Sequence, residues 1–128
     1  MFCAVVAWLL FLLMPFCCRE VSGKTKCAQA IGVLDCPSDP KKAADVEVYL
    51  MDDDGFLNPD DTMGWTTSNE KGEFTVQGCG YDLWSLPEPY LKILHFCGSS
   101  SEKVLKTPAK YIFRPHTIDY GIISLEGN

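Results

Sequence analysis

Apolar and polar residues alternate along short stretches of this chain, and a two-residue period is the signal of β-strands. Between residues 46 and 51, Val46, Val48 and Leu50 alternate with residues that suit an outer face. The strongest pattern runs from Tyr90 to Cys97 and begins just after two prolines, which are excluded from strand centres. Together the patterns predict strands over residues 27–36, 46–51, 64–67, 73–76, 90–97, 104–106, 110–113 and 118–125.

The connections between these strands are short and carry turn residues. Residues 64–67 and 73–76 flank the segment 68–72, in which Gly72 can adopt a positive φ, so they predict a hairpin with a longer turn. Residues 80–86 predict a turn or a single helical turn. No long helical pattern appears between residues 24 and 128.

This series of strands is typical of an all-β domain. We predict a two-sheet antiparallel Greek-key sandwich of seven to eight strands, stabilised by disulfides. The predicted inward-facing residues are Val46, Val48, Leu50, Phe74, Val76, Leu91, Ile93, Ile112 and Leu125. A length of 128 residues leaves room for one such domain.

The first residues predict a targeting signal. Every residue from Phe2 to Met14 is apolar, which is too short for a comfortable membrane span and matches a secretory signal. We expect residues 1–23 to be a signal peptide cleaved after Gly23, with cleavage after Cys18 as the alternative, and residues 24–128 to form the domain. An N-terminal anchor is the other interpretation, but no basic flank or second apolar stretch supports it. The sequence therefore predicts a secreted, extracellular protein that is not transmembrane.

The cysteines fit that compartment. Of 7 cysteines, Cys3, Cys17 and Cys18 lie in the predicted signal. Those that remain, and that are expected to form two disulfides, are Cys27, Cys36, Cys79 and Cys97. Four cysteines allow three pairings, and the pattern does not choose among them.

Metal and cofactor sites are not predicted. There is no C-x-x-C pair, and His95 and His116 do not stand at zinc-finger intervals from the cysteines. A structural histidine is the preferred interpretation of His95 beside Cys97. We expect neither a cofactor nor a metal.

The charge balance excludes one class of partner. The chain has 11 Lys and Arg against 17 Asp and Glu, a net charge of -6, and no basic run. Nucleic acid is therefore not an expected partner.

An acidic loop between two predicted strands is the candidate binding site. Its carboxylates, which suit Ca²⁺ by chemistry, are Asp52, Asp53, Asp54, Asp60 and Asp61. The spacing is not that of an EF-hand, because counting from Asp52 puts Phe56 at position five and Leu57 at position six. A solvated acidic loop is the preferred interpretation, and an irregular Ca²⁺ loop is the alternative. Phe56 and Leu57 could mark a contact with a partner or membrane, or pack onto Trp65.

One sheet face is predicted to be partly apolar on its outer side. Its residues are Tyr49, Met51, Lys92, Leu94 and Phe96. Such a face could be an interface, or a second core layer covered by loops, and the second interpretation is preferred.

Catalysis is not predicted. The chain has no G-x-S-x-G motif, and oxidised cysteines supply no thiolate. Arg114 and His116 could form a basic site, but an exposed turn explains them better.

Six segments together resemble the nematode transthyretin-like family. They are Gly32-Val33-Leu34-Asp35-Cys36, Val46-Glu47-Val48-Tyr49-Leu50, the acidic loop with Asp60-Asp61, Gly72-Glu73-Phe74, residues 89–97 (Pro-Tyr-Leu-Lys-Ile-Leu-His-Phe-Cys) and residues 120–126. The resemblance extends from about Cys27 to Glu126. It implies a secreted prealbumin-like sandwich with a bridge between Cys36 and Cys97, and an additional bridge between Cys27 and Cys79. The turn at 68–72 departs from the shorter turn common in the family.

The resemblance also bears on function. Enzymes of related fold hydrolyse 5-hydroxyisourate with histidines, an arginine and a C-terminal Tyr-Arg-Gly-Ser, whereas this chain ends in Ser-Leu-Glu-Gly-Asn and carries only His95, His116 and Arg114 as candidates. The resemblance implies an extracellular binding or adaptor protein without catalysis, one role for which is to bridge lipid head groups and a cell-surface receptor. The alternatives are a carrier of a small apolar ligand, as in transthyretin, and a secreted effector or inhibitor of a protein target.

Overall fold

A computed structural model describes residues 24–55, 59–82 and 86–127 of the chain. The predicted signal peptide, the apolar loop residues Phe56 and Leu57, and residues 83–85 of the predicted turn at 80–86 lie outside the described residues. Residues 80–82 of that predicted turn are instead the end of a strand. Within the described ranges, no helix is long and apolar enough to span a membrane.

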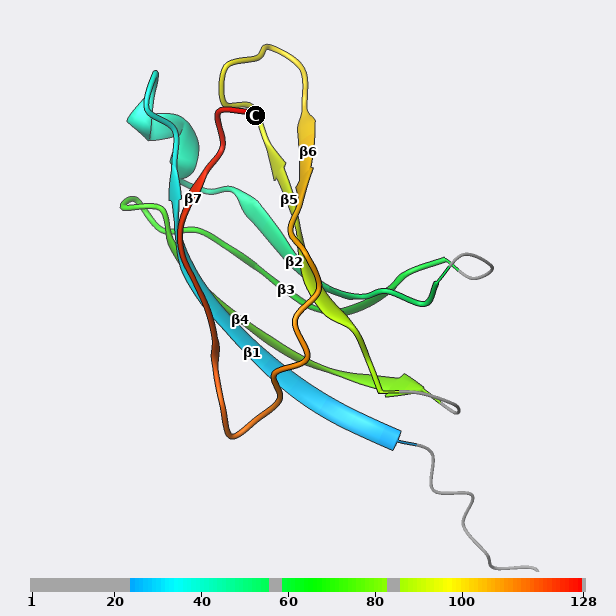
Figure 1. The fold of residues 1–128 in the computed structure, drawn as a ribbon. Coiled ribbons are helices and arrows are strands. Elements are labelled where there is room, and N and C mark those ends of the chain that lie inside the picture. The colour runs from blue at the N-terminus through cyan, green and yellow to red at the C-terminus, as the bar shows by residue number, and fades with distance from the viewer. Residues whose placement is uncertain (1–23, 56–58, 83–85, 128) are drawn as a thin grey trace, which may run out of the picture.

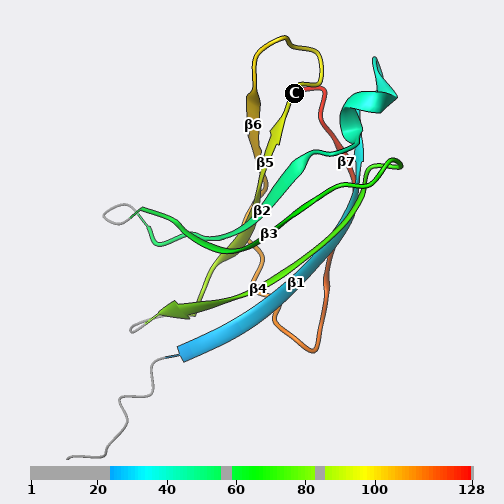
Figure 2. The same cartoon turned by 180° about the vertical axis from the view of Figure 1, so that it is seen from behind.

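Seven strands form two sheets, which confirms the predicted fold class (Figures 1 and 2). The three-stranded sheet has the order β4-β1-β7 and the four-stranded sheet the order β3-β2-β5-β6. Their bounds are β1 Lys24–Asp35, β2 Glu47–Asp52, β3 Asp61–Thr67, β4 Glu73–Asp82, β5 Pro89–His95, β6 Lys103–Lys106 and β7 Ile118–Ser124. All ladders are antiparallel except that between β1 and β7. A 3₁₀ helix, Pro40–Ala43, follows β1.

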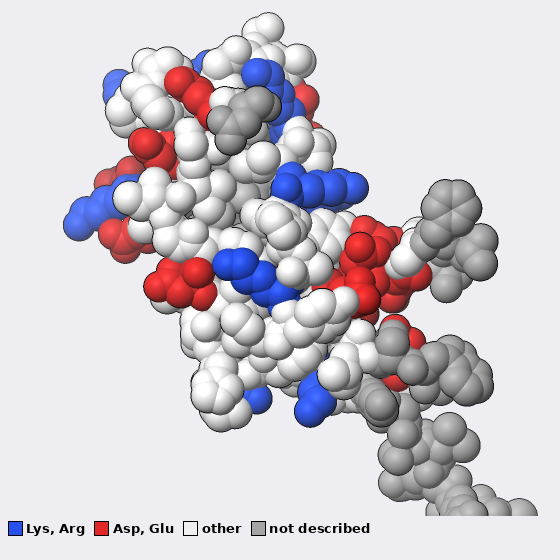
Figure 3. Space-filling model, viewed as in Figure 1, with Lys and Arg blue, Asp and Glu red and all other residues white. Residues whose placement is uncertain are grey.

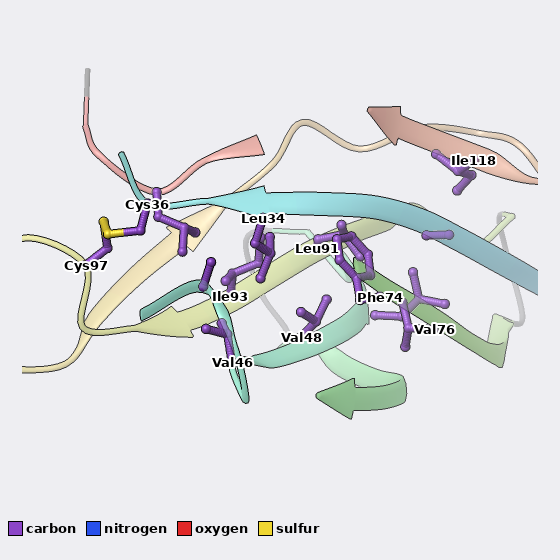
Figure 4. Close-up of a cluster of buried hydrophobic side chains, with 14 of the residues drawn as sticks. Leu34, Cys36, Val46, Val48, Phe74, Val76, Leu91, Ile93, Cys97 and Ile118 are labelled. Atoms are coloured by element: carbon purple, nitrogen blue, oxygen red, sulfur yellow. A yellow bond between two sulfur atoms is a disulfide. The ribbon is translucent and has the colours of Figure 1, made fainter. Parts of the chain in front are cut away.

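The core lies between the two sheets and is built by the predicted alternation. Val48 and Leu50 on β2 are fully buried, and so are Leu91 and Ile93, their neighbours on β5 (Figure 4). From the other sheet, Phe74 and the residues of β1 pack onto them. Of the predicted core residues only Ile112 is wrongly placed, since it is 38% exposed.

Two disulfides join the strands, with the pairing that the family resemblance implies. Cys36 and Cys97 are bonded, and both are completely buried, so this bridge ties the end of β1 to the segment after β5 and hence one sheet to the other (Figure 4). Cys27 and Cys79 are bonded between directly opposite positions of β1 and β4, and Cys79 is exposed. Disulfides of this kind persist in oxidising compartments.

The predicted hairpin between residues 64–67 and 73–76 is wrong in its pairing. The turn at 68–72 exists and Gly72 has φ 79°, but β3 pairs with β2 while β4 pairs with β1. The turn is tied to the three-stranded sheet because Leu34 donates its N–H to the Gly72 carbonyl at 2.8 Å. It therefore carries the chain from one sheet to the other.

The predicted strand at 110–113 does not form. Its backbone is used to connect the sheets: Lys110 donates its N–H to the carbonyl of Pro89 on β5, and Arg114 donates to the carbonyl of Cys27 on β1. Pro108 and Pro115 flank the segment and supply no N–H groups for a ladder. The alternation of residues 110–113 thus reflects a crossing segment.

Candidate functional site

Carboxylates gather at one end of the sandwich, where β2 ends and β3 begins. Figure 3 shows them as a red group on this side of the molecule, away from the 3₁₀ helix. Asp52 and Asp61 are directly opposite each other as the last pair of the β2–β3 ladder, so the acidic loop begins only after Asp52. Asp82 closes β4 at the same end. The structure therefore brings the predicted acidic residues Asp52, Asp53, Asp54, Asp60 and Asp61 to one end.

Asp52 is the buried member of this acidic end. Its side chain is 1% exposed, and its Oδ1 accepts the Glu88 N–H at 2.8 Å. Burial raises the pKa of Asp52, and the charges of Asp82 and Asp61 raise it further, whereas the Glu88 hydrogen bond lowers it. Carboxyl groups with a raised pKa are found at functional sites, and also in buried networks that have only a structural role.

Two further hydrogen bonds hold the loop against the sandwich. The Tyr90 hydroxyl donates to Oδ2 of Asp60, and the Asp53 N–H donates to the Glu88 carbonyl at 3.1 Å. Burial, followed by the bond to Asp60, raises the pKa of Tyr90. The acidic loop is therefore anchored to the start of β5.

The acidic end predicts a pH dependence of stability. Burial, a hydrogen bond with Asp61 and the charge of Asp52 raise the pKa of Asp54 from 3.8 to about 6. Between pH 3.8 and about 6 the folded protein therefore binds more protons than the unfolded chain. In buffer with a chelator, which keeps metal ions off the carboxylates, its free energy of unfolding should rise as the pH falls from 7 to 5. Asp54→Asn should reduce this gain, which urea unfolding at the two pH values measures.

The pH dependence of the parent must be compared with that of Asp54→Asn, because His95 changes the free energy of unfolding in the opposite direction. Burial and then Lys103 lower the pKa of His95, so the unfolded chain binds more protons than the folded protein and stability falls as the pH drops below the ordinary value of 6.5. That contribution is common to both proteins and cancels in the difference. An Asp54→Asn variant with an unchanged pH dependence would refute the assignment.

The second candidate surface is a row of side chains on the outer face of the four-stranded sheet. Ladder partners place Trp65, Tyr49, Lys92 and Lys106 side by side across β3, β2, β5 and β6. Trp65 is 63% exposed, and its ring stacks on Tyr49 with centroids 6.4 Å apart. Nζ of Lys92 lies 5.7 Å from the centre of the Tyr49 ring. We call these four residues the aromatic–lysine row.

The alternation in the sequence predicts only part of this face. It correctly places Tyr49 and Lys92 on the outer side. We expected loops to cover that side as a second core layer, whereas Phe96 is 47% exposed and Val104 of β6 is 54% exposed. Met51 is buried although the β2–β5 register is regular there: its ladder partner Tyr90 is buried as well, and its Sδ accepts a hydrogen bond from the Thr62 hydroxyl at 3.5 Å. Trp65 and Lys106 were missed since only the strand order brings them beside Tyr49 and Lys92.

Among the histidine and arginine candidates, His95 is separated from Arg114 and His116, which share one turn. His95 stands beside Cys97, which is bonded to Cys36 at the far end of β1, whereas the Arg114 N–H is bonded to Cys27 near its start. The nine residue steps along the strand from Cys27 to Cys36 correspond to about 30 Å. His95 and Arg114 cannot act on one substrate atom across that distance.

The fold and these surfaces define a disulfide-bonded β-sandwich with an acidic end and an exposed aromatic–lysine row. A family model for the transthyretin-like family matches residues 31–114. The chain therefore belongs to the transthyretin-like family.

Two relatives come from Caenorhabditis elegans. Transthyretin-like protein 46 is 32% identical over 105 residues, covering 74% of this chain and 57% of that protein. Transthyretin-like protein 16 is 32% identical over 95 residues, covering 74% of this chain and 69% of that protein. The chain thus spans less than two thirds of the length of the first. Among solved structures, a 9R-lipoxygenase from Cyanothece matches with a TM-score of 0.48 and 18% identity over 84% of this chain and 17% of its own, which is too low to inform the interpretation.

Proposed function

We propose that this chain is a secreted binding or adaptor protein that acts outside the cell without catalysing a reaction, and that its aromatic–lysine row binds anionic phospholipid head groups. The row is the observation that carries the proposal. Family membership and the two disulfides support an extracellular site of action.

The two lysines of the row lie directly opposite each other, an arrangement of like charges that sheets usually avoid. Lys92 and Lys106 are direct partners in the β5–β6 ladder and share the outer face. Like charges in directly opposite positions destabilise a sheet, so the two lysines do not stabilise the ladder through each other. Two ammonium groups side by side suit a phosphate or carboxylate group between them.

The aromatic half of the row suits the same ligand. Trp and Tyr favour the boundary between water and lipid, because one part of the ring system is apolar and another donates hydrogen bonds. Trp65 is exposed enough to reach a surface, while Tyr49 is held by its hydroxyl bond to Oε2 of Glu47 at 3.1 Å. Binding by this face should weaken as the salt concentration rises, because salt screens the attraction between the exposed lysines and an anionic head group.

A carrier function receives less support. The space between the sheets is filled by buried side chains (Figure 4). One described pocket, of about 390 Å³, lies against Ile31 and Val33, which belong to the outer face of the three-stranded sheet. The described residues therefore favour binding on a surface over enclosure of a ligand.

Co-sedimentation with phospholipid vesicles tests the proposal. We expect the secreted protein to bind vesicles containing phosphatidylserine and not neutral vesicles. Lys92→Glu should weaken binding about tenfold or more, because one surface cation contributes about 1 kcal/mol and its charge is reversed. Trp65→Ala should also weaken it.

Lys71→Glu is the matched control, since Lys71 is an exposed turn residue outside the row and the charge change is the same. Equal losses for Lys92→Glu and Lys71→Glu would show a non-specific charge effect and refute the row as the site. If the protein binds neither the phosphatidylserine vesicles nor the neutral ones, the lipid proposal as a whole is refuted.

A further inference from the structure

One oxygen of the buried Asp52 has no partner. Oδ1 accepts the Glu88 N–H, but Oδ2 is buried and makes no hydrogen bond in the described part of the chain. A carboxylate buried with an unsatisfied oxygen is costly, and in native proteins such a group commonly meets an ion or water. Oδ2 therefore points to a ligand.

The surroundings of Asp52 are acidic. Asp61 faces it across the ladder, and Asp54 forms a hydrogen bond with Asp61 that raises its pKa. The groups that act on the pKa values of Asp52 and Asp54 are carboxylates and a backbone N–H, without a cation among them. Lys106 stands outside this group, where it lines a pocket of about 170 Å³ with Asp53 and Asp60.

Gly80 of β4 lies close to the unsatisfied oxygen. A Cβ at this position would stand 3.2 Å from Oδ2 of Asp52 and equally close to Pro87. A side chain larger than that of glycine would therefore crowd this oxygen.

We propose that Asp52, Asp54 and Asp61 bind a divalent cation at this end of the sandwich, with Ca²⁺ as the preferred ion. Ca²⁺ takes hard oxygen ligands in irregular geometry, whereas Mg²⁺ demands a near-ideal octahedron. The cation would supply the missing partner of Oδ2 and offset the repulsion among the carboxylates.

Binding requires these carboxylates to move together. In the described residues, the one trio of potential ligands already within 4.8 Å is Cys36, Cys97 and Glu126, whose two sulfur atoms are bonded to each other and cannot coordinate as thiolates. The ion should therefore draw Asp54 and the start of β3 toward Asp52, which lowers its affinity relative to a preformed site.

Calorimetric titration with CaCl₂, together with thermal unfolding in CaCl₂ or chelator, tests the proposal without any lipid, so its result is independent of the proposed function. For the secreted protein we expect binding heat and a higher Tm in calcium. Asp52→Asn should lose about tenfold or more in affinity, because it removes a charged ligand. Its stability in chelator should not fall, because a buried, poorly paired charge is removed.

Asp35→Asn is the control, since Asp35 is exposed at the opposite end of β1 and the variant loses the same charge. It should bind Ca²⁺ as the parent does. The proposal would be overturned if the parent protein shows neither binding heat nor a shift of Tm in calcium. It would also be overturned if Asp52→Asn and Asp35→Asn bind Ca²⁺ with equal affinity. If Asp52→Asn does not fold, Asp61→Asn decides by the same criterion, because Asp61 is exposed and its replacement leaves the core untouched.

Discussion

Removal of the disulfide between Cys36 and Cys97 is expected to lower the free energy of unfolding by about 4 kcal/mol or more. The bridge closes a loop with a sequence separation of 61, for which the restriction of the unfolded chain alone corresponds to about 4 kcal/mol. Both sulfur atoms are also in the core, so Cys36→Ala with Cys97→Ala leaves a void between the sheets. Urea unfolding of the double variant measures the loss.

The second disulfide is the internal comparison. Cys27 and Cys79 have a separation of 52, so the same chain-entropy argument gives nearly the same figure. This bridge joins neighbouring strands at a partly exposed position, and its removal opens no core void. The loss should therefore be smaller for Cys27→Ala with Cys79→Ala. A loss equal to or larger than that at Cys36 and Cys97 would contradict the assignment of the buried bridge as the inter-sheet link.

Replacement of Gly78 by alanine is expected to destabilise the protein by about 2 kcal/mol or more, the cost of forcing extra volume into a packed site. At this point β3 and β4, which belong to different sheets, approach closely. A Cβ on Gly78 would stand 1.9 Å from the Met63 carbonyl oxygen, and one on Gly64 would stand 2.1 Å from that of Gln77. Because the obstructing atoms are backbone, no rotamer change can relieve the overlap.

Gly127→Ala provides the control for this experiment. Gly127 has no atom near its ideal Cβ position and no positive φ, so its replacement should leave thermal unfolding almost unchanged. Gly64→Ala should resemble Gly78→Ala. Similar Tm values for Gly78→Ala and Gly127→Ala would show that β3 and β4 do not need their close approach.

Much of the fold could be predicted because it depends on local alternation. Val48, Leu50, Leu91 and Ile93 follow the two-residue period, and each is buried as expected. Residues 110–113 have the same period, yet the Lys110 N–H bonds to the Pro89 carbonyl and the Ile112 N–H to the Lys110 carbonyl, so the segment does not form a ladder. Local pattern reports which side chains are apolar, whereas ladder formation depends on which backbone lies alongside.

The candidate sites, like the fold, could be predicted from the sequence only in part. The acidic loop was evident from composition, but the burial of Asp52 was not, because it depends on β5 and its preceding loop closing over the end of β2. Trp65 and Lys106 are 41 positions apart in the chain and meet in one row only through the strand order β3-β2-β5-β6. Juxtapositions of this kind arise from topology, which a single sequence specifies only indirectly.

The central claim is that the outer face of the four-stranded sheet is the lipid-binding surface, and an NMR titration tests it most directly. Backbone and indole N–H signals of the ¹⁵N-labelled secreted protein would be followed while a short-chain phosphatidylserine is added. We expect chemical-shift changes that centre on Trp65, Tyr49, Lys92 and Lys106 and saturate together. Saturating shifts confined to the other sheet, around Ile31 and Ile122, or no shifts at all, would contradict it.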